Sequence, residues 1–524
     1  MIGRCLLRVQ LIIICTPASF LSGYTQPLKH AHCSAMLAII AIGNLLALAL
    51  LNVLELSTAA VLWIWPLGLA LGWFLVRGLR WRAARTALPK AATYLVIAWV
   101  LLLTAPRLPY LLDRIPDAHI LGTGDDHGRL AELVSLTKSP RYPVLHPSNQ
   151  EYLLSHYYAA FYPMVWLKFA APSLTLKECI LLGNLLYHVL FAGALLELAA
   201  RLFHRQRDAL AFLFLMTFFS GLDWVTTLPH LFEHSEHWFR HWFGEWREIS
   251  AMYTVTWWAV HHAFGMWILL VGYLIVTQAR WQARWRKPFV GGLLLISALY
   301  ASVFVLVALP FVAPRLLWRL GLRLLRNGLW IPLAAIALCP AFLFFGRLTE
   351  AAFRLALPRP VPILVYLAGV LVLEVPLLWW LVRKDRRMLG VLVFFVSCLF
   401  VGSIGLNNYT MRGILIPTVI LYACAAPRLA ALRWQKPLAL AAISLTAIGV
   451  LREAAWLTYR PLESSPLYWR LTNRDMPAFA AKRLQNIGGL DRFNNDEMLS
   501  GVPLEAMDFN EVELLRLPRK GWFR

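Results

Sequence analysis

Apolar runs of helical length recur along most of the chain, separated by short polar or basic segments. A helix of about 20 apolar residues can cross a bilayer, because its backbone amides bond within the helix and lipid offers them no other partner. The runs predict spans at about 36–54, 57–76, 91–109, 152–171, 179–200, 209–227, 251–278, 289–312, 328–346, 361–382, 389–406, 411–426 and 437–452. Residues 289–312 fit one span or a tight pair of short helices. The pattern predicts an all-α polytopic transmembrane bundle of about 11–13 helices.

Lys and Arg residues gather in the short loops between these runs, which is typical of loops that stay in the cytoplasm. Such basic clusters lie within 77–90, 280–287, 315–326, 383–387 and 428–436. Alternation then places 110–150, 228–250, 347–360, 404–410 and the tail 453–524 on the opposite face. We therefore expect a multi-pass protein of the inner (cytoplasmic) membrane with periplasmic outer loops.

One basic cluster conflicts with this alternation. Arg201, Arg205 and Arg207 also predict a cytoplasmic turn. With the loops 110–150 and 228–250 both outside, only one net crossing fits between residues 152 and 200. Either the aromatic-rich segment before residue 171 is interfacial or re-entrant, or the basic turn departs from the rule.

Composition agrees with a membrane protein. Of the 524 residues, 59% are hydrophobic and 15% charged, whereas soluble domains carry about a quarter charged residues. The net charge of +22 would indicate nucleic acid in a soluble protein. Here the cations lie between apolar runs, so they indicate topology and attraction to anionic lipid. We expect membrane lipid as a partner, and no nucleic acid.

Three regions follow from this pattern. Residues 1–35 are either a signal-like segment or an extension ahead of a start at Met36. Residues 36–452 form the transmembrane helical domain with its two large outer loops. Residues 453–524 form a small outer tail that is charged and only weakly apolar.

The first candidate site lies in the loop 110–150, in the sequence TGDDHGRL. Asp125 and Asp126, with Arg129 nearby, could provide a general base, a metal ligand or a set facing phosphate. The same residues also fit a capped helix start, followed by a short amphipathic helix on the membrane surface. The two interpretations are compatible, because a cap also fixes a carboxylate in place.

Two further segments combine aromatic and ionisable residues. His156 and Tyr157 could line a site, although a loop crossing an aromatic belt explains them equally well. Residues 230–250 carry four His and four Glu among Trp and Phe. They have no HExxH spacing, which favours an interfacial helix over a metal site.

The last two candidates lie inside or beside spans. His261 and His262 fall within the span 251–278, where ionisable groups normally face the bundle interior or a wet cavity. The alternative is a neutral histidine bonded to a neighbouring helix. Asn407, Asn408 and Arg412 lie where a span meets the outer face. Arg412 could bind a phosphate through two hydrogen bonds, or extend its charged end to the interface.

Taken in order, these segments resemble the GT-C superfamily of membrane glycosyltransferases, in particular poorly characterised bacterial polytopic branches. The resemblance covers about 120–420. It rests on the acidic pair, then Tyr142-Pro143, the SGLD phrase at 220–223, the helix entry with His261-His262, and the phrase NNYTMR-P ending at Pro417. Asn408 stands where an aspartate is common.

The resemblance implies an inverting transfer from a polyprenyl-phosphate sugar donor to an acceptor hydroxyl. Asp125 or Asp126 would be the catalytic base, and Arg412 and His262 would face the leaving phosphate, with Arg129 less central. His261, Asn407, Asn408, His156 and Tyr157 would contribute to binding. Some relatives use a divalent ion, Mg²⁺ or Mn²⁺, and others use none, so a metal cofactor stays open.

Two other classes of protein fit the same sequence. A transporter or flippase of a lipid-linked or anionic solute would use the His pair, Arg412 and Glu374 along a path. Such a protein should carry ionisable residues through the whole membrane depth, and no repeat between halves is visible. An inactive assembly partner with the GT-C fold is the other alternative.

Overall fold

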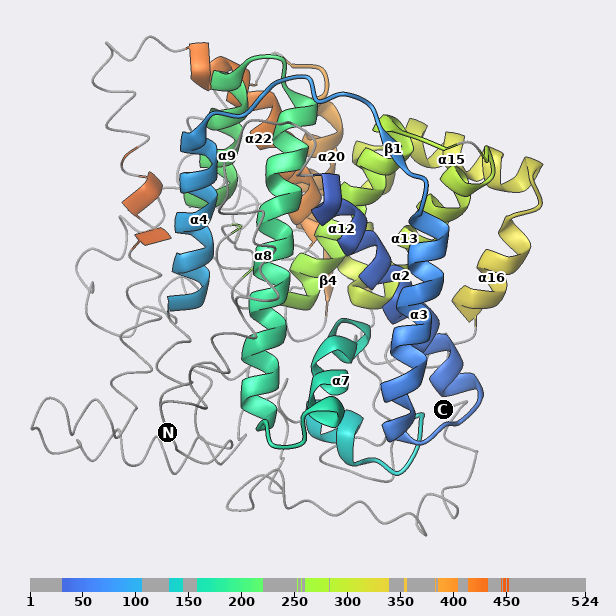
Figure 1. Cartoon of the computed structure of the whole chain (residues 1–524). Coiled ribbons are helices and arrows are strands. Elements are labelled where there is room, and N and C mark those ends of the chain that lie inside the picture. The colour runs from blue at the N-terminus through green and yellow to red at the C-terminus, as the bar shows by residue number, and fades with distance from the viewer. Residues whose placement is uncertain are drawn as a thin grey trace, which may run out of the picture.

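The computed structural model describes residues 31–105, 132–144, 158–219, 260–281, 283–338, 353–355, 385–403 and 413–431, with a few isolated positions from 252 to 451. These residues are mainly helical (Figure 1). The α-helices are α2 (Ala31–Val53), α3 (Val61–Val76), α4 (Lys90–Thr104), α7 (Tyr162–Ala170), α8 (Leu176–Leu202), α9 (Gln206–Phe218), α12 (Val260–Gln278), α13 (Arg286–Ala301), α14 (Leu309–Val312), α15 (Pro314–Arg326), α16 (Trp330–Leu338), α20 (Met388–Phe400) and α22 (Leu415–Ala431). The 3-10 helices are η2 (Thr58–Ala60), η5 (Tyr158–Phe161) and η8 (Val303–Leu306), and the strands are β1 (Arg80–Trp81), β2 (Ala279–Arg280), β3 (Phe353–Leu355) and β4 (Val401–Ser403).

Four helical stretches within this described part are long and apolar enough to cross a membrane, namely Cys33–Val53, Thr58–Val76, Leu176–Leu202 and Val260–Gln278. They match four of the expected spans, which supports a helical membrane protein. Helix α2 begins at Ala31, so it includes the last residues of the expected N-terminal extension. The helices α4, α20 and α22 are apolar but shorter.

Helices α2 and α3 form an antiparallel pair with very close backbones. An added Cβ at Gly68 would lie 2.7 Å from the carbonyl oxygen of Gly43, and one at Gly72 would lie 2.8 Å from that of Ile39. Gly68 and Gly72 form a GxxxG sequence, a spacing that brings two small residues onto one helix face. The two helices can approach this closely only because glycine has no side chain at these positions.

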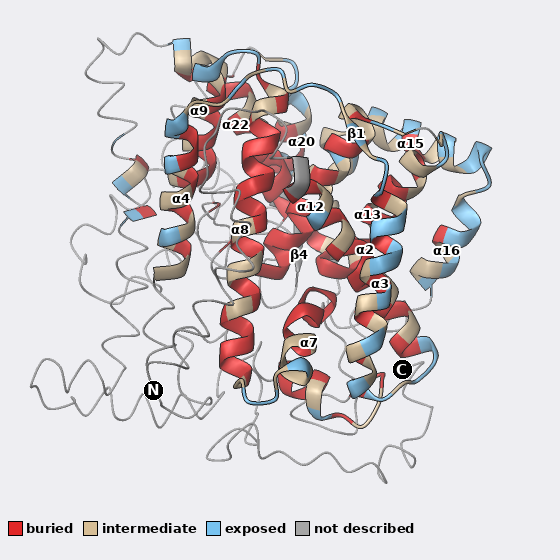
Figure 2. Cartoon of the chain, viewed as in Figure 1, coloured by how far each residue is buried: buried red, intermediate tan, exposed pale blue. Residues whose placement is uncertain are grey.

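Helix α8 lies in the middle of the bundle and is buried along most of its length (Figure 2). It begins with a capping box, in which Thr175 and Glu178 bond to each other's backbone amide groups. Near its other end, Glu197 is 2% exposed and its Oε1 accepts hydrogen bonds from the backbone amides of Cys33 (3.1 Å) and Ser34 (3.5 Å). The carboxylate therefore caps the first turn of α2, where amides have no partner within the helix.

The basic loops meet at one end of the bundle, at the top of Figure 1. Strand β1 pairs with β2, with Arg80 opposite Arg280. Arg201 donates to the carbonyl oxygen of Arg82 at 2.5 Å, and the amide of Arg85 donates to Ala200 at 3.0 Å. The basic turn after α8 therefore lies beside the linker 77–90.

This arrangement bears on the conflict in the sequence pattern. Helix α7 has only nine residues, a length of about 13 Å, which is too short to span a bilayer. It lies at the end of the bundle opposite the basic loops (Figure 1). Helix α8 runs between the two ends of the bundle, which is consistent with the first alternative.

Residues 286–312 form a tight pair of short helical arms. Helix α13 ends at Ala301, and the chain reverses at Ser302, whose backbone is extended. The returning arm, η8 and α14, packs against α20, where an added Cβ at Gly390 would clash with the carbonyl oxygen of Phe311. Helix α15 then turns by 103° and lies across the basic end of the bundle.

The described residues are mostly helical, as the all-α prediction expected, and the strands form only two short pairs, β1 with β2 and β3 with β4. The structure departs from the sequence prediction in two places. The expected span 389–406 is helical only as far as Phe400, where α20 ends. Residues 132–138 are helical as expected, but Glu132 and Ser135 are buried like the apolar face, so this is not a helix with one exposed polar face.

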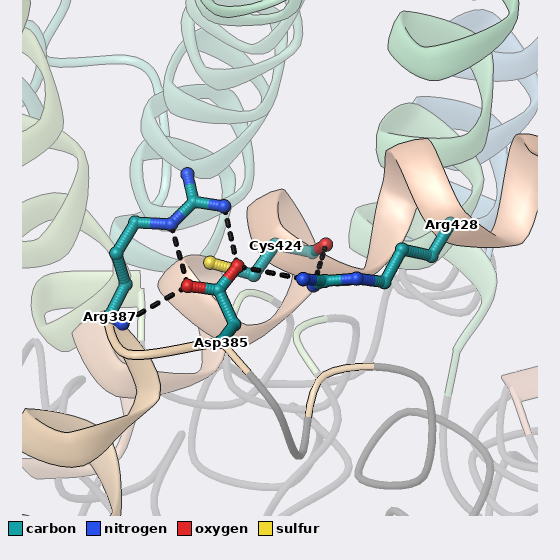
Figure 3. Close-up of polar contacts among 4 residues, drawn as sticks. All are labelled: Asp385, Arg387, Cys424 and Arg428. Carbon is teal, nitrogen blue, oxygen red and sulfur yellow. Dashed lines mark hydrogen bonds and ion pairs between the residues drawn. The ribbon is translucent and has the colours of Figure 1, made fainter.

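A compact ion-pair cluster joins the start of α20 to the end of α22 (Figure 3). Arg387 donates to both carboxylate oxygens of Asp385, from Nε at 2.9 Å and from Nη2 at 2.6 Å. Arg428 donates to the same carboxylate at 3.1 Å and to the backbone carbonyl of Cys424. Because Asp385 has a side chain only 9% exposed, this cluster clamps two helices together.

We expect Asp385→Asn to lower the thermal unfolding midpoint at neutral pH and to have a smaller effect in acid. The hydrogen bonds from Arg387 hold the pKa of Asp385 well below its ordinary value of 3.8. A carboxylate with a lowered folded-state pKa stabilises the fold above its unfolded pKa, and the contribution disappears as pH falls through the folded value. Unfolding in detergent, followed from about pH 7 to about pH 3, tests this. A gap between variant and wild type that does not narrow would contradict it.

Candidate functional site

The two adjacent histidines, His261 and His262, lie in the first turn of α12. They are 1% and 0% exposed, with ring centroids 3.8 Å apart. From His262 to the basic end of α12 at Gln278 the helix rises about 24 Å, at about 1.5 Å per residue. The pair therefore lies toward the end of the bundle opposite the basic loops.

His262 is held by the reversal between α13 and η8. Its Nδ1 lies 2.5 Å from Oγ of Ser302. Gly265, one turn along α12, allows this approach, because an added Cβ there would lie 3.2 Å from Val305 and 3.5 Å from Ser302. The bond fixes the ring and leaves Nε2 as the second polar atom, whose role depends on the tautomer.

A group of three buried tyrosines packs near the same end. Tyr142, Tyr158 and Tyr162 are all 0% exposed, and Tyr162 has ring centroids 6.4 Å from each of the other two. The hydroxyl of Tyr158 donates to Oδ1 of Asn52 in α2 at 3.3 Å. Burial, and then the neighbouring Tyr158, raise the pKa of the Tyr142 phenol well above its ordinary value, so this hydroxyl stays neutral.

The tyrosines and histidines are joined through η5. Phe161 lies with its ring centroid 6.4 Å from that of His261. The hydroxyl of Tyr187 donates to the carbonyl oxygen of Ala160 at 2.6 Å, which ties η5 to α8. We call Tyr142, Tyr158, Tyr162, His261 and His262 the Tyr–His cluster.

The segment that follows the acidic motif is fastened beside this cluster. Thr58 donates to the carbonyl oxygen of Ser139 at 2.7 Å, and the amide of Tyr142 donates to Leu56 at 2.8 Å. Arg141 also faces Glu55 at 3.9 Å. The turn between α2 and α3 therefore anchors residues 139–142.

The segment that follows Arg412 also lies close to the Tyr–His cluster, beside η8. An added Cβ at Gly413 would lie 2.9 Å from Val307 and 3.5 Å from the carbonyl oxygen of Phe304. The Phe304 ring in turn packs edge-on against His262, with centroids 6.4 Å apart. The first described residue after Arg412 is thus one side chain away from His262.

Among the residues predicted for the site, His261 and His262 lie within the described part of the chain. Those outside it are Asp125, Asp126, Arg129, His156, Tyr157, Asn407, Asn408 and Arg412. The His- and Glu-rich segment 230–250 and Glu374 also lie outside it. Three described residues that belong to or adjoin predicted motifs connect to the His pair through intermediate residues. Tyr142 and Tyr158 do so through Tyr162 and Phe161, and Gly413 does so through Phe304.

Sequence reasoning missed Ser302 and Asn52. Both are single polar residues inside apolar runs, and both are buried. A buried hydroxyl or amide needs a hydrogen-bond partner, so the pattern could have indicated that each bonds to another polar group. Within the described ranges no group of three or more His, Cys, Asp or Glu side chains is placed to hold a metal ion.

Comparison of the chain with protein-family models, with curated proteins and with solved structures finds no match.

Proposed function

We propose that this chain is a GT-C-type glycosyltransferase of the cytoplasmic membrane, which moves a sugar from a polyprenyl-phosphate donor to an acceptor hydroxyl on the outer face. One observation carries the proposal. Tyr142, Tyr158 and Gly413 belong to or adjoin three of the predicted motifs, and each connects to the His pair through a neighbouring side chain. Tyr142 and Tyr158 pack on Tyr162, which follows Phe161 beside His261, and Gly413 lies against Phe304 beside His262. Motifs far apart in sequence would converge in this way if they built one site.

In the proposed reaction the acceptor oxygen attacks the anomeric carbon with inversion. Asp125 or Asp126 accepts the hydroxyl proton as the new C–O bond forms and the bond to the phosphate breaks. Polyprenyl phosphate leaves as an anion, and Arg412 and His262 stabilise the charge that develops on it. Arg129 is a less favoured candidate for the same role. A divalent ion, if one is used, would supply the same kind of stabilisation.

The bond from Ser302 gives His262 a defined role in this scheme. A histidine fixed at Nδ1 presents Nε2 in one direction, and a fixed donor stabilises a developing anion better than a mobile one. The apolar rings of Phe161 and Phe304 lie beside the pair, one next to His261 and the other next to His262. This environment suits a donor that enters from lipid.

The transporter alternative draws on ionisable residues buried along α8, namely Lys177, Glu178, His188, Glu197 and Arg201. Three of the five make structural contacts, and one of them is Arg201, which donates to the carbonyl oxygen of Arg82. Glu178 completes the capping box of α8, and Glu197 caps α2. They therefore add little to a translocation path, and the one-sided Tyr–His cluster favours the enzyme.

The proposal is tested with purified protein in lipid, given a panel of polyprenyl-phosphate sugars and a membrane glycolipid extract as acceptor. Release of free polyprenyl phosphate is measured. Asp125→Asn or Asp126→Asn is expected to reduce release by about 10²–10⁴-fold, the usual contribution of a general base. Asp117→Asn, in the same loop, is the matched control and should stay active.

Two outcomes would overturn parts of the proposal. If both variants keep wild-type turnover, the base assignment is wrong. If the wild type moves the intact donor across a vesicle membrane and releases no polyprenyl phosphate, the chain is a transporter.

A further inference from the structure

The basic end of the bundle carries a cluster of cations that the proposed reaction does not use. The cluster contains Arg82 just after β1, Arg280 in β2, Lys287 in the first turn of α13, and Arg323 in the last turn of α15. The three arginines are exposed, whereas Lys287 is partly buried and donates to the carbonyl oxygen of Ala279 at 2.9 Å. Three segments distant in sequence thus bring four positive charges together.

Backbone contacts hold this cluster in place. The amide of Arg82 donates to Gln278 at 3.1 Å, next to the pairing of β1 with β2. Helix α15 packs on α13, where added Cβ atoms at Gly291 and Gly292 would lie 3.4 Å and 3.5 Å from Leu320 and Leu324. The cations are therefore parts of a built surface.

The charges in this cluster oppose one another. Burial, and then the guanidinium groups of Arg323, Arg82 and Arg280, lower the pKa of Lys287. None of the ion pairs found in the described part of the chain involves these four residues. A bound anion would relieve the repulsion, since opposite charges at short range favour the charged form of each group.

The position of the cluster indicates the source of that anion. Helix α15 lies across the ends of the apolar helices, with Leu320 buried and Trp318 and Leu325 exposed at 70% and 60%. A helix with leucine and tryptophan on one side and arginine on the other is typical of the boundary between acyl chains and headgroups. Lipid phosphate groups lie at that level.

We propose that Arg82, Arg280, Lys287 and Arg323 bind the phosphate headgroup of an anionic phospholipid in the leaflet that these loops face. The site lies at the end of α12 opposite His262 and takes a different ligand from the sugar donor, so it does not depend on the proposed reaction. The three exposed arginines would contact the phosphate oxygens, and the partly buried Lys287 would add a further positive charge beneath them.

The test uses full-length protein in nanodiscs of phosphatidylcholine, with or without phosphatidylglycerol. Native mass spectrometry measures retained lipid, and tryptophan fluorescence measures the thermal midpoint. Wild type is expected to retain phosphatidylglycerol and to unfold at a higher temperature with it. The triple variant Arg82→Gln, Arg280→Gln and Arg323→Gln should bind it at least about tenfold more weakly.

The matched control removes three charges from the same end of the bundle, through Arg205→Gln, Arg207→Gln and Arg386→Gln. These arginines are exposed and lie outside the cluster. The control should retain phosphatidylglycerol as the wild type does. Equal losses in both triple variants would mean that net charge alone attracts the lipid, and would overturn the proposal. So would equal thermal protection by inorganic phosphate in phosphatidylcholine nanodiscs, which would indicate a soluble anion.

Discussion

Replacing Glu197 with alanine is expected to lower the stability of the fold by about 2–5 kcal/mol. The Glu197 carboxylate accepts from the amides of Cys33 and Ser34 at the start of α2. Without it, two buried N–H groups lose their acceptor, at a cost of about 1–3 kcal/mol each. Thermal or denaturant unfolding in detergent, followed by tryptophan fluorescence, measures the change.

Glu197→Gln is the matched variant for this prediction. Its amide oxygen replaces Oε1 as an acceptor, so we expect a clearly smaller loss than in Glu197→Ala. Similar losses in the two variants would show that the charge of Glu197, through its interaction with Arg201, matters more than the capping bonds. No measurable loss in either would contradict the capping role.

Replacing Gly68 with leucine is expected to separate α2 from α3 and to destabilise the protein by about 1–3 kcal/mol or more. Even the Cβ would lie 2.7 Å from the Gly43 carbonyl oxygen, and its other near neighbours are also backbone atoms of Gly43, at 3.2 and 3.3 Å. Gly68→Ala should already show part of the loss. Thermal unfolding and the yield of monodisperse protein in detergent measure the effect.

Gly321 provides the control for this substitution. It also lies within a helix, α15, but an added Cβ there meets nothing within 4 Å. Gly321→Ala should leave stability unchanged or raise it slightly, because alanine favours a helix over glycine by about 1 kcal/mol. If Gly68→Ala is as harmless as Gly321→Ala, the close packing of α2 on α3 is not important for stability.

The sequence predicted long spans well where apolar length alone decides the structure. Helices α8 and α12 lie close to the expected ranges 179–200 and 251–278. The sequence left the run 152–171 open between a span and an interfacial or re-entrant segment. In the described part of that run the helix α7 has only nine residues and ends at Ala170, and η5 just before it is bonded to α2 and α8.

The candidate site was likewise predictable only in part from the sequence. The histidine pair was identified from its residue type, since ionisable groups in an apolar helix are unusual. Its bond to Ser302 was not predictable, because 40 residues separate His262 from Ser302 and only the reversal after α13 brings them together. The approach of Gly413 to Phe304 likewise depends on how the residues just before α22 lie against η8.

By itself the sequence determined a mainly helical membrane protein with its basic residues in short loops, because burial of backbone amides in lipid requires long apolar helices. Tertiary structure decided which helices touch and how polar side chains meet. The cap of Glu197 on α2 and the contact of Gly68 with Gly43 arise from residues far apart in the chain. No local pattern specifies such contacts, since they depend on the packing of whole helices.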